Sequence, residues 1–353
     1  MQNNQQNHPV QPQPQQNYQY QQPIHPYPQY SPYPNQIIQQ NQQQLQYNPP
    51  QYGQIKLFEN FTIFLSKELG RGQYGVVYLC IDNNTQNQYA CKMVAIQNKL
   101  EVTQELQVAQ EIRGEFICEL KYAGVSSNHL YLIQEYCPDG TLKQYFQKNQ
   151  NIPIDEIMRI FLQIVKGYKY SLYSKSCVHR DIKLDNILMK DNRPKICDFG
   201  FGKFLDDIDS QIILSYKCTP LYGAPQITHT TKIKYTYKAD IYSLGVLLYQ
   251  MTNKLKNPNQ MKNNSDLLNF HEQNLQNGIK ETLIFYDFVD PNIKELIYNM
   301  MEYSEEKRIS IDDLEKRTEQ IIVYLRNPTS QEFKEYKQSN NQSNKYFFGK
   351  TTS

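Results

Sequence analysis

The hydrophobic and polar positions divide this chain into three parts. Residues 1–54 are nearly all Gln, Asn, Pro and Tyr, with almost no charge and few aliphatic side chains. Such a segment buries too little apolar surface to offset the entropy of ordering its backbone. Hydrophobic positions become dense over residues 58–326, and residues 327–353 are polar again. We therefore predict a disordered arm (1–54), one folded domain (58–326) and a polar C-terminal tail (327–353).

Alternation of apolar and polar residues predicts strands near the start of the domain. Residues 76–81 alternate and are rich in β-formers, residues 82–85 have turn composition, and residues 89–96 predict a second strand. A helical pattern follows over residues 101–112. A second, shorter hairpin is predicted for residues 187–197, with its turn at Lys190-Asp191-Asn192-Arg193.

A strongly apolar stretch at residues 239–249 predicts a buried helix. Its length of about eleven residues suits a core helix rather than a membrane span, which needs roughly 18 or more apolar residues. The N-terminus also lacks the apolar core of a secretory signal. We therefore expect no membrane span and a cytoplasmic location.

Charge and cysteine content exclude other classes of protein. The formal net charge is +2, and no run of Lys or Arg marks a basic patch, so we expect no nucleic-acid partner. Seven cysteines form an odd set without CxxC spacing, which argues against a disulfide framework and a zinc ribbon. Cys197 precedes an acidic residue and could be reactive, but the interpretation as a small buried side chain is favoured. The seven are Cys80, Cys91, Cys118, Cys137, Cys177, Cys197 and Cys218.

The first chemical signal is a glycine pattern, GxGxxGxV, that begins after Leu69 and contains Gly70, Gly72 and Gly75. A dinucleotide-binding loop would be followed by a helix, whereas a strand follows here. In a strand-turn-strand, glycines let backbone N–H groups approach the phosphates of a nucleotide. A glycine-containing hairpin without function remains an alternative at this point.

Lys92 lies within an otherwise apolar predicted strand, where an ammonium group requires an anionic partner. A phosphate and a carboxylate would serve. Among Glu101, Glu105 and Glu111 of the following helix we prefer Glu105, because it shares an apolar face. That face is made of Leu106, Ala109 and Ile112. A solvated helix face is the alternative.

The segment from Cys177 to Met189 carries the decisive motif. It contains His179-Arg180-Asp181 and Asn186, and Asp198-Phe199-Gly200 follows seventeen positions after Asp181. Residue for residue, the segment resembles the HRDxxxxN catalytic loop and the DFG motif of the protein kinase family. The predicted hairpin between the two motifs would bring Asn186 and Asp198 together, and their oxygens suit Mg²⁺.

The resemblance implies an α+β, bilobal fold and a role for each motif. The N-lobe (58–134) would be a small antiparallel sheet with one helix, the hinge would be 135–140, and the larger C-lobe (141–326) would be mainly helical. ATP and Mg²⁺ would bind between the lobes.

Four side chains would then carry the chemistry. Asp181 would be the catalytic base, and Lys183 would stabilise the transferring phosphate, which favours Ser and Thr acceptors. Lys92 would anchor the phosphates and pair with Glu105, while Asn186 and Asp198 would hold the metal. Asp185 suggests a preference for basic residues near the acceptor.

The nucleotide base would lie against the hinge. Backbone groups of Glu135 and Cys137 would read the adenine edge, and Gln134 would occupy the gatekeeper position. Apolar side chains would enclose the ring, although each of them could equally be a core residue. They are Leu65, Leu69, Val77, Ala90 and Leu188.

Residues 218–226 resemble the end of a kinase activation segment, in which Thr219 would brace Asp181 and Lys183. Cys218 replaces a usual Gly, and Gln226 replaces the Glu that normally pairs with a distant Arg, here Arg308. Loss of that buried ion pair would make the C-lobe less rigid. Tyr242 stands where kinases usually have Trp.

Regulation is predicted through Arg180, a cation that in similar kinases pairs with a phosphorylated activation-segment residue. Ser215 lies where that phosphate would be expected, with Tyr216 and Ser210 as lesser candidates. An ordinary exposed serine is the alternative.

Two classes of function compete on this sequence. A phosphotransferase acting on Ser and Thr of protein substrates is favoured, because Lys92, Asp181, Asn186 and Asp198 are all present. A pseudokinase scaffold, with the Gln-rich arm recruiting partners, is the alternative. An assembly protein driven by the arm would explain only residues 1–54. The domain is compatible with calcium/calmodulin-type or autophagy-initiating kinases.

Overall fold

A computed structural model describes residues 54–72, 75–96, 99–205, 212–214, 219–228 and 233–327. The chain separates into two units, residues 1–50 and residues 51–353, and only the second contains described residues. Residues 1–53 of the predicted disordered arm and residues 328–353 of the predicted tail lie outside the described residues. Cys218, Ser210, Ser215 and Tyr216 lie outside them as well.

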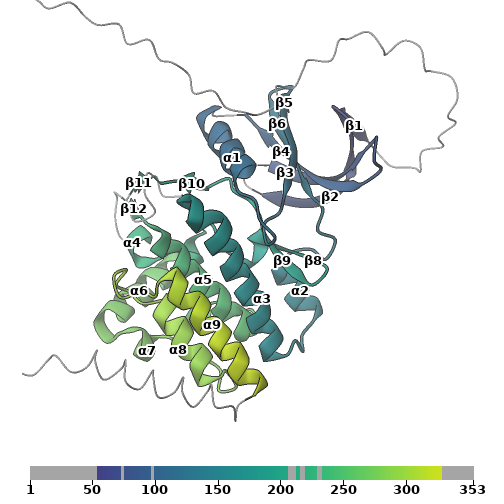
Figure 1. The fold of residues 1–353 in the computed structure, drawn as a ribbon. Coiled ribbons are helices and arrows are strands. Elements are labelled where there is room, and N and C mark those ends of the chain that lie inside the picture. The colour runs from purple at the N-terminus through teal and green to yellow at the C-terminus, as the bar shows by residue number, and fades with distance from the viewer. Residues whose placement is uncertain are drawn as a thin grey trace, which may run out of the picture. The chain divides into compact units, whose positions relative to one another are not determined.

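An antiparallel sheet of six strands forms the first part of the described fold, in the order β1-β2-β3-β4-β6-β5 (Figure 1). The antiparallel register of β2, β3 and β4 agrees with the strand-turn-strand prediction for the glycine pattern. The first strand begins at Ile55, three residues ahead of the predicted start of the domain. The strands are β1 (Ile55–Phe58), β2 (Phe61–Gly72), β3 (Gly75–Asp82), β4 (Gln88–Ala95), β5 (Leu120–Ser126) and β6 (His129–Glu135).

One face of the sheet packs against helix α1 (Lys99–Glu111), which lies beside it in Figure 1. Val108 and Ala109 of α1 are buried in the same cluster as Leu130 and Leu132 of β6. The alternation along β4 and β6 directs every second side chain toward this helix. Lys92 and Glu105 therefore approach each other from the sheet and from α1.

The opposite face is closed by aromatic side chains of the first hairpin. The Phe58 ring stacks on Tyr131 of β6, with centroids 4.1 Å apart, and meets the edge of Tyr122 of β5. A Cβ atom at Gly124 would lie 2.9 Å from Phe58 Cζ, so glycine there lets the phenyl ring approach. The sheet thus curls until β1 packs over β5 and β6.

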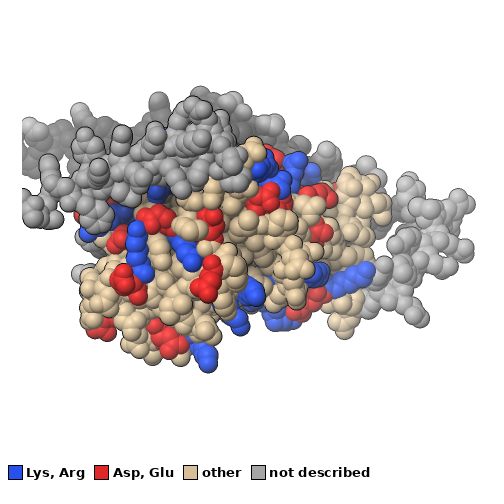
Figure 2. Space-filling view, turned by 90° about the horizontal axis from the view of Figure 1, so that it is seen from below, with Lys and Arg blue, Asp and Glu red and all other residues tan. Residues whose placement is uncertain are grey.

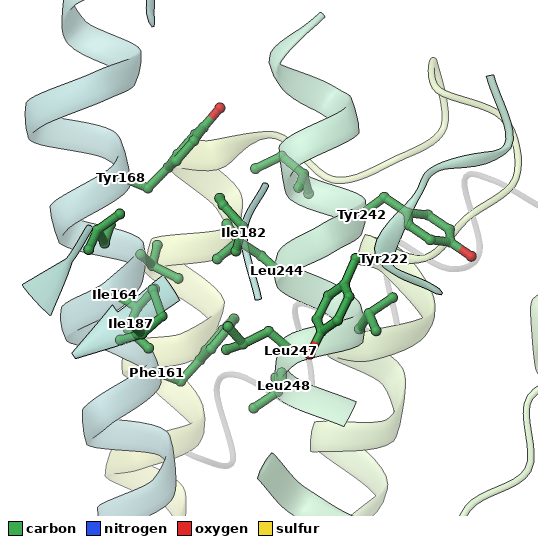
Figure 3. Packing of buried hydrophobic residues seen from close by; sticks show 14 of the residues in the cluster. Phe161, Ile164, Tyr168, Ile182, Ile187, Tyr222, Tyr242, Leu244, Leu247 and Leu248 are labelled. Atoms are coloured by element: carbon green, nitrogen blue, oxygen red, sulfur yellow. The ribbon is translucent and has the colours of Figure 1, made fainter. Parts of the chain in front are cut away.

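Helices make up the second part of the described fold, below the sheet in Figure 1. Helix α5 crosses its centre, and all but one of its residues are buried. Figure 3 shows Leu244, Leu247 and Leu248 of α5 meeting Phe161 and Ile164 of α3. The helices are α2 (Leu142–Lys148), α3 (Ile154–Gly167), α4 (Pro225–Thr228), α5 (Tyr237–Thr252), α6 (Asn264–Asn277), α7 (Ile279–Thr282), α8 (Pro291–Met300) and α9 (Ile311–Arg326).

Three two-stranded pairs lie among the helices. The pair of β8 (Ile187–Lys190) and β9 (Arg193–Ile196) confirms the predicted second hairpin. The others join β7 (Cys177–Val178) to β10 (Lys203–Phe204) and β11 (Ile212–Leu214) to β12 (Ile233–Tyr235). Single turns of 3₁₀ helix occur at Tyr173–Lys175, Leu184–Asn186, Pro220–Tyr222 and Pro258–Gln260, and a π-helical turn at Tyr168–Leu172.

The predicted α+β class, with a small antiparallel sheet, one helix on it and a larger helical part, is confirmed. On the face drawn in Figure 2, Lys and Arg are interspersed with Asp and Glu. No helix in the part of the chain that the structure describes is both long enough and apolar enough to span a membrane.

Candidate active site

Lys92 stands at the centre of the site, between two carboxylates. Its Nζ lies 2.6 Å from Glu105 Oε1 and 2.7 Å from Asp198 Oδ1. Only 10% of the Lys92 side chain is exposed, so both carboxylates contact a largely desolvated ammonium group. The predicted contact with Glu105 is therefore present, and three distant segments of the chain meet at one atom.

Opposite charge fixes the ionisation of this cluster. Burial by itself lowers the pKa of Lys92, but the charges of Asp198 and Glu105 outweigh it and leave the pKa above its ordinary value. Burial by itself raises the pKa of Asp198, but the charge and hydrogen bond of Lys92 outweigh it and leave that pKa below its ordinary value. At neutral pH the lysine is charged and the aspartate is ionised.

Asp181 is held by donors from three sides. Thr219 Oγ1 donates to its Oδ1 at 2.6 Å, while Lys183 Nζ and Asn186 Nδ2 both donate to its Oδ2 at 2.7 Å. Lys183 Nζ also donates to Thr219 Oγ1 at 2.8 Å. The predicted bracing by Thr219 is thus present as a set of contacts, and it fixes the orientation of the carboxylate.

His179 connects the segments of Asp181 and Asp198. Its Nδ1 accepts from the Asp181 N–H at 3.2 Å, so Nε2 carries the proton and donates to the carbonyl of Cys197 at 3.0 Å. Arg180 and Asp198 have φ values of 69° and 64°, in the left-handed region that non-glycine residues seldom adopt. Strained backbone at both motifs is typical of a functional site.

Asn186 and Asp198 have the donor atoms that Mg²⁺ prefers. Asn186 Nδ2 donates to both the carbonyl and the side chain of Asp181, so the amide oxygen is the atom left for a ligand. Asp198 offers a second carboxylate oxygen beside the one that accepts from Lys92. Hard oxygens of this kind fit the metal. In the described ranges no group of three or more His, Cys, Asp or Glu side chains could hold a metal ion.

The three glycines of the predicted loop have different roles in the packing. A Cβ at Gly75 would lie 2.2 Å from the carbonyl oxygen of Met93, so the close approach of β3 and β4 demands glycine there. At Gly70 and Gly72 a Cβ would meet nothing within 4 Å. Packing between the strands therefore explains why residue 75 is glycine, but it does not explain the glycines at positions 70 and 72.

Strand register brings most of the expected nucleotide-contact residues onto the face that carries Lys92. Val77 lies directly opposite Lys92, and Ala90 lies opposite Gln134. Leu69 is 42% exposed, and Leu188 is half-buried on β8. The prediction that Leu65 encloses the adenine ring is corrected, because Leu65 packs against the aromatic cluster on the other face of the sheet.

Glu135 has a side-chain role that the sequence did not indicate. Its carboxylate accepts from Lys190 at 2.8 Å and lies 3.2 Å from Lys195, both from the β8–β9 hairpin. Burial alone raises the pKa of Glu135, but the hydrogen bond from Lys190 and the charge of Lys195 bring it below its ordinary value. The side chain thus ties the end of β6 to the helical part, next to the buried Cys137.

A polar pocket of about 310 Å³ lies beside this ion pair. None of Lys92, Asp181 or Asp198 lines it, so it is separate from the charged cluster. Its lining includes Tyr89, Tyr136, Lys121, Lys190 and Glu119.

Gln226 and Arg308 meet as the sequence suggested, through the amide oxygen of Gln226. Arg308 is 2% exposed and donates to Gln226 Oε1 at 3.3 Å. Its other donors reach the carbonyls of Lys238 and Glu302 at 2.7–3.1 Å. The guanidinium also lies 5.2 Å from the centre of the Tyr242 ring. Carbonyl dipoles and an aromatic face thus surround this buried cation.

The interpretation of Cys197 as a small buried side chain is confirmed, since it is 9% exposed. Burial raises the pKa of its thiol well above the usual value, and the charge of Asp198 raises it further. A thiol of this kind is a poor nucleophile. The six cysteines in the described ranges are all free.

Comparisons with known proteins agree with this geometry. A family model described as "Protein kinase domain" matches residues 64–318. The serine/threonine-protein kinase atg1 of Dictyostelium discoideum is 29% identical over 266 residues, covering 70% of this chain and 38% of that protein. The serine/threonine-protein kinase unc-51 of Caenorhabditis elegans is 28% identical over 283 residues, covering 73% and 31%.

The human serine/threonine-protein kinase ULK1 is 34% identical over 182 residues, covering 48% of this chain and 17% of that protein. The chain therefore spans well under half the length of these curated relatives. The similarity extends over the sheet and the helices but leaves β1 outside the family match.

Proposed function

Because the chain belongs to the protein kinase family, we propose that its domain transfers the γ-phosphoryl group of ATP to serine and threonine hydroxyls of protein substrates. The observation that carries the proposal is the contact of Lys92 Nζ with both Glu105 and Asp198. That arrangement leaves a charged lysine in contact with an ionised aspartate, and Thr219, Lys183 and Asn186 hold the carboxylate of Asp181. Names of the similar proteins, all serine/threonine-protein kinases, support the same class of acceptor.

Asp181 would act as the base in this reaction. The hydroxyl oxygen of the substrate attacks the γ-phosphorus, the bond from that phosphorus to the β–γ bridging oxygen breaks, and ADP leaves. The hydroxyl proton passes to Asp181, whose orientation is fixed by Thr219, Lys183 and Asn186. Lys183 Nζ, 2.7 Å from Asp181, supplies positive charge beside the transferred group.

Lys92, Asn186 and Asp198 would hold the phosphates and their metal. Lys92 would contact the α- and β-phosphates while Glu105 keeps its ammonium group in place. Asn186 and Asp198 would hold Mg²⁺, which would supply positive charge to the phosphates. Gly70 and Gly72, where a Cβ would meet nothing within 4 Å, would let backbone N–H groups of the glycine pattern approach the same phosphates.

The adenine would lie between the sheet and β8. Leu69, Val77, Ala90 and Leu188 would enclose the ring, and the backbone of Glu135 and Cys137 would read its edge. Gln134, opposite Ala90, would line the back of the pocket with a polar group.

A preference for basic residues near the acceptor is part of the proposal. The Asp185 side chain is 48% exposed, beside the loop that carries Asp181. Its contact with Lys143 spans 3.4 Å between two exposed groups, and such pairs are worth little. A substrate Arg or Lys would therefore displace Lys143 at small cost.

The test is phosphorylation of a degenerate peptide library by the purified chain with Mg²⁺ and ATP. We expect transfer to Ser and Thr acceptors and none to Tyr. Asp198→Asn should abolish it, because the metal carboxylate becomes a neutral amide. The matched control is Asp191→Asn, the same change at an exposed turn of the β8–β9 hairpin, which should keep wild-type activity.

Two outcomes would contradict the proposal. Transfer that persists in Asp198→Asn would come from a contaminating kinase. An inactive wild-type chain that still binds nucleotide would favour the scaffold alternative. The prediction for Ser215 stays a prediction, because that residue lies outside the described ranges.

A further inference from the structure

Asp240 is a fully buried carboxylate that holds the catalytic loop from behind. It lies in the first turn of α5 and is 0% exposed. Its Oδ2 accepts from the backbone N–H of His179 at 2.7 Å, and its Oδ1 accepts from the N–H of Arg180 at 2.9 Å. The orientation of this carboxylate therefore sets the backbone of the two residues that precede Asp181.

Tyr168 contacts the same carboxylate from a different element. Its hydroxyl donates to Asp240 Oδ2 at 2.9 Å, and the residue is 0% exposed. Figure 3 shows its ring pointing from the α3 side of the core toward α5. Asp240 thus receives a side-chain donor from one helix in addition to the two backbone donors of the loop.

The position of Tyr168 depends on an irregular turn. Regular α-helix α3 ends at Gly167, and Tyr168–Leu172 form a π-helical turn in which the Tyr173 N–H reaches back to the carbonyl of Tyr168. A π turn accommodates one residue more than an α turn, is rare, and often occurs at functional sites. Tyr170, two residues further along the same turn, is 59% exposed.

Core filling alone does not account for a hydroxyl at Tyr168. Tyr168 is packed in the main hydrophobic cluster, where a phenylalanine would fill the same space without a polar atom. The hydroxyl instead reaches a carboxylate that already accepts from the catalytic loop. A donor to a buried, charged acceptor contributes more than one between neutral groups.

We propose that Tyr168 is a positioning residue for phosphoryl transfer: through Asp240 it fixes the His179–Arg180 backbone and so the orientation of Asp181. The inference rests on the proposed function of this site. His179 carries the effect further, because its ring bonds both the Asp181 N–H and the carbonyl of Cys197. The Tyr168 hydroxyl acts through its hydrogen bond to Asp240.

The test compares Tyr168→Phe with Tyr170→Phe in steady-state peptide phosphorylation by the full chain. Both changes remove one hydroxyl from the same π turn. Each hydroxyl donates to a carboxylate, but that of Tyr170 donates to Glu315 of α9, remote from the loop. We expect Tyr168→Phe to lower kcat about tenfold with the KM for ATP unchanged, since one hydrogen bond corresponds to about one power of ten.

Tyr170→Phe should leave kcat and KM at wild-type values. Both variants are assayed below their melting temperatures, so that loss of folded protein does not lower kcat. Equal kcat in Tyr168→Phe and wild type would overturn the inference, as would an equal loss in both variants. An inactive wild-type chain would instead overturn the proposed function.

A double-mutant cycle with Asp240→Asn separates positioning from general stability. If Tyr168 acts through Asp240, adding Tyr168→Phe to Asp240→Asn should lower kcat by less than about twofold further. A full tenfold further loss would mean that the hydroxyl acts elsewhere and would refute the link. If Tyr168→Phe fails to fold, the kcat of the single variant Asp240→Asn is compared with that of wild type. An unchanged kcat in Asp240→Asn would refute the proposal.

Discussion

At the scale of single residues, the charged groups of this protein are ordered by neighbours of opposite charge or by oriented dipoles. Lys92 is held by two carboxylates, and Asp181 is held by donors from Thr219, Lys183 and Asn186. Arg308 donates to carbonyl oxygens and to the Gln226 amide, and its guanidinium lies over the Tyr242 ring. A neutral amide at a buried guanidinium is a position at which a charged acceptor can be tested.

Gln226→Glu should raise the melting temperature. The substitution places a carboxylate at the atom that now accepts from Arg308 at 3.3 Å, and charged acceptors bind guanidinium more strongly than amides do. We expect about 1 kcal/mol of added stability, or about 2 °C for a domain of this size. Differential scanning calorimetry of wild type, Gln226→Glu and Gln226→Ala is the measurement. A Gln226→Glu variant that melts at or below wild type would show that desolvation of the new charge outweighs the ion pair.

At the scale of elements, β1 and the first three residues of β2 are the part of the sheet that the family match does not include. Aromatic contacts hold this hairpin to the sheet: Phe58 stacks on Tyr131, and Phe61 meets Tyr89 and Tyr122. On the outer side of β1, Leu57 is 68% exposed. The two faces of this short strand should therefore differ sharply in their contribution to stability.

Phe58→Ala should destabilise the protein by about 3 kcal/mol, because it removes a buried ring and leaves a cavity against Tyr131 and Gly124. Leu57→Ala, on the adjacent exposed position, should change the free energy of unfolding by less than about 0.5 kcal/mol. Urea unfolding followed by tyrosine fluorescence measures both. If Phe58→Ala lowered the free energy of unfolding by as little as Leu57→Ala, the β1 hairpin would add little to the stability of the sheet.

At the scale of the whole described domain, a shared hydrophobic cluster, ion pairs and backbone hydrogen bonds join the sheet to the helical part. Lys92 of β4 contacts Asp198, and Glu135 of β6 contacts Lys190 and Lys195. The loop before β5 also pairs its backbone with β9, where the Cys118 N–H donates to the Ile196 carbonyl at 2.8 Å. A ligand held by groups from both parts should therefore stabilise the domain as a unit.

Adding Mg²⁺ and ADP should raise the melting temperature of the wild-type chain. At a ligand concentration about one hundred times its Kd, linkage adds about 2.7 kcal/mol to the stability of the folded state. Asp198→Asn should lose the part of the shift that depends on Mg²⁺, while Asp191→Asn should keep it. Differential scanning fluorimetry with and without EDTA makes the comparison. A shift that EDTA leaves unchanged in wild type would argue against a metal held by Asp198.

The sequence by itself determined the class of fold and the residues predicted to carry the chemistry. Periodicity predicted strands within β3 and β4 and the β8–β9 hairpin, because alternation along a half-buried strand is a local property of the chain. It also selected Glu105 over its neighbours, since an apolar face fixes which side of a helix meets the sheet. Motif spacing identified Asp181, Asn186 and Asp198, although their roles remain predictions.

Only the tertiary structure decided what depends on contacts between distant segments. Three such contacts have no local signal: Glu135 pairs with two lysines, Leu65 packs on the opposite face of the sheet, and Gly75 lies against a neighbouring carbonyl. The sequence also does not reveal the hydrogen bond from the Tyr168 hydroxyl to Asp240, because 72 positions separate the two residues. The π turn that orients the Tyr168 ring has no hydrophobic period of its own. Contacts of this kind follow from how elements pack, which local patterns of polarity do not encode.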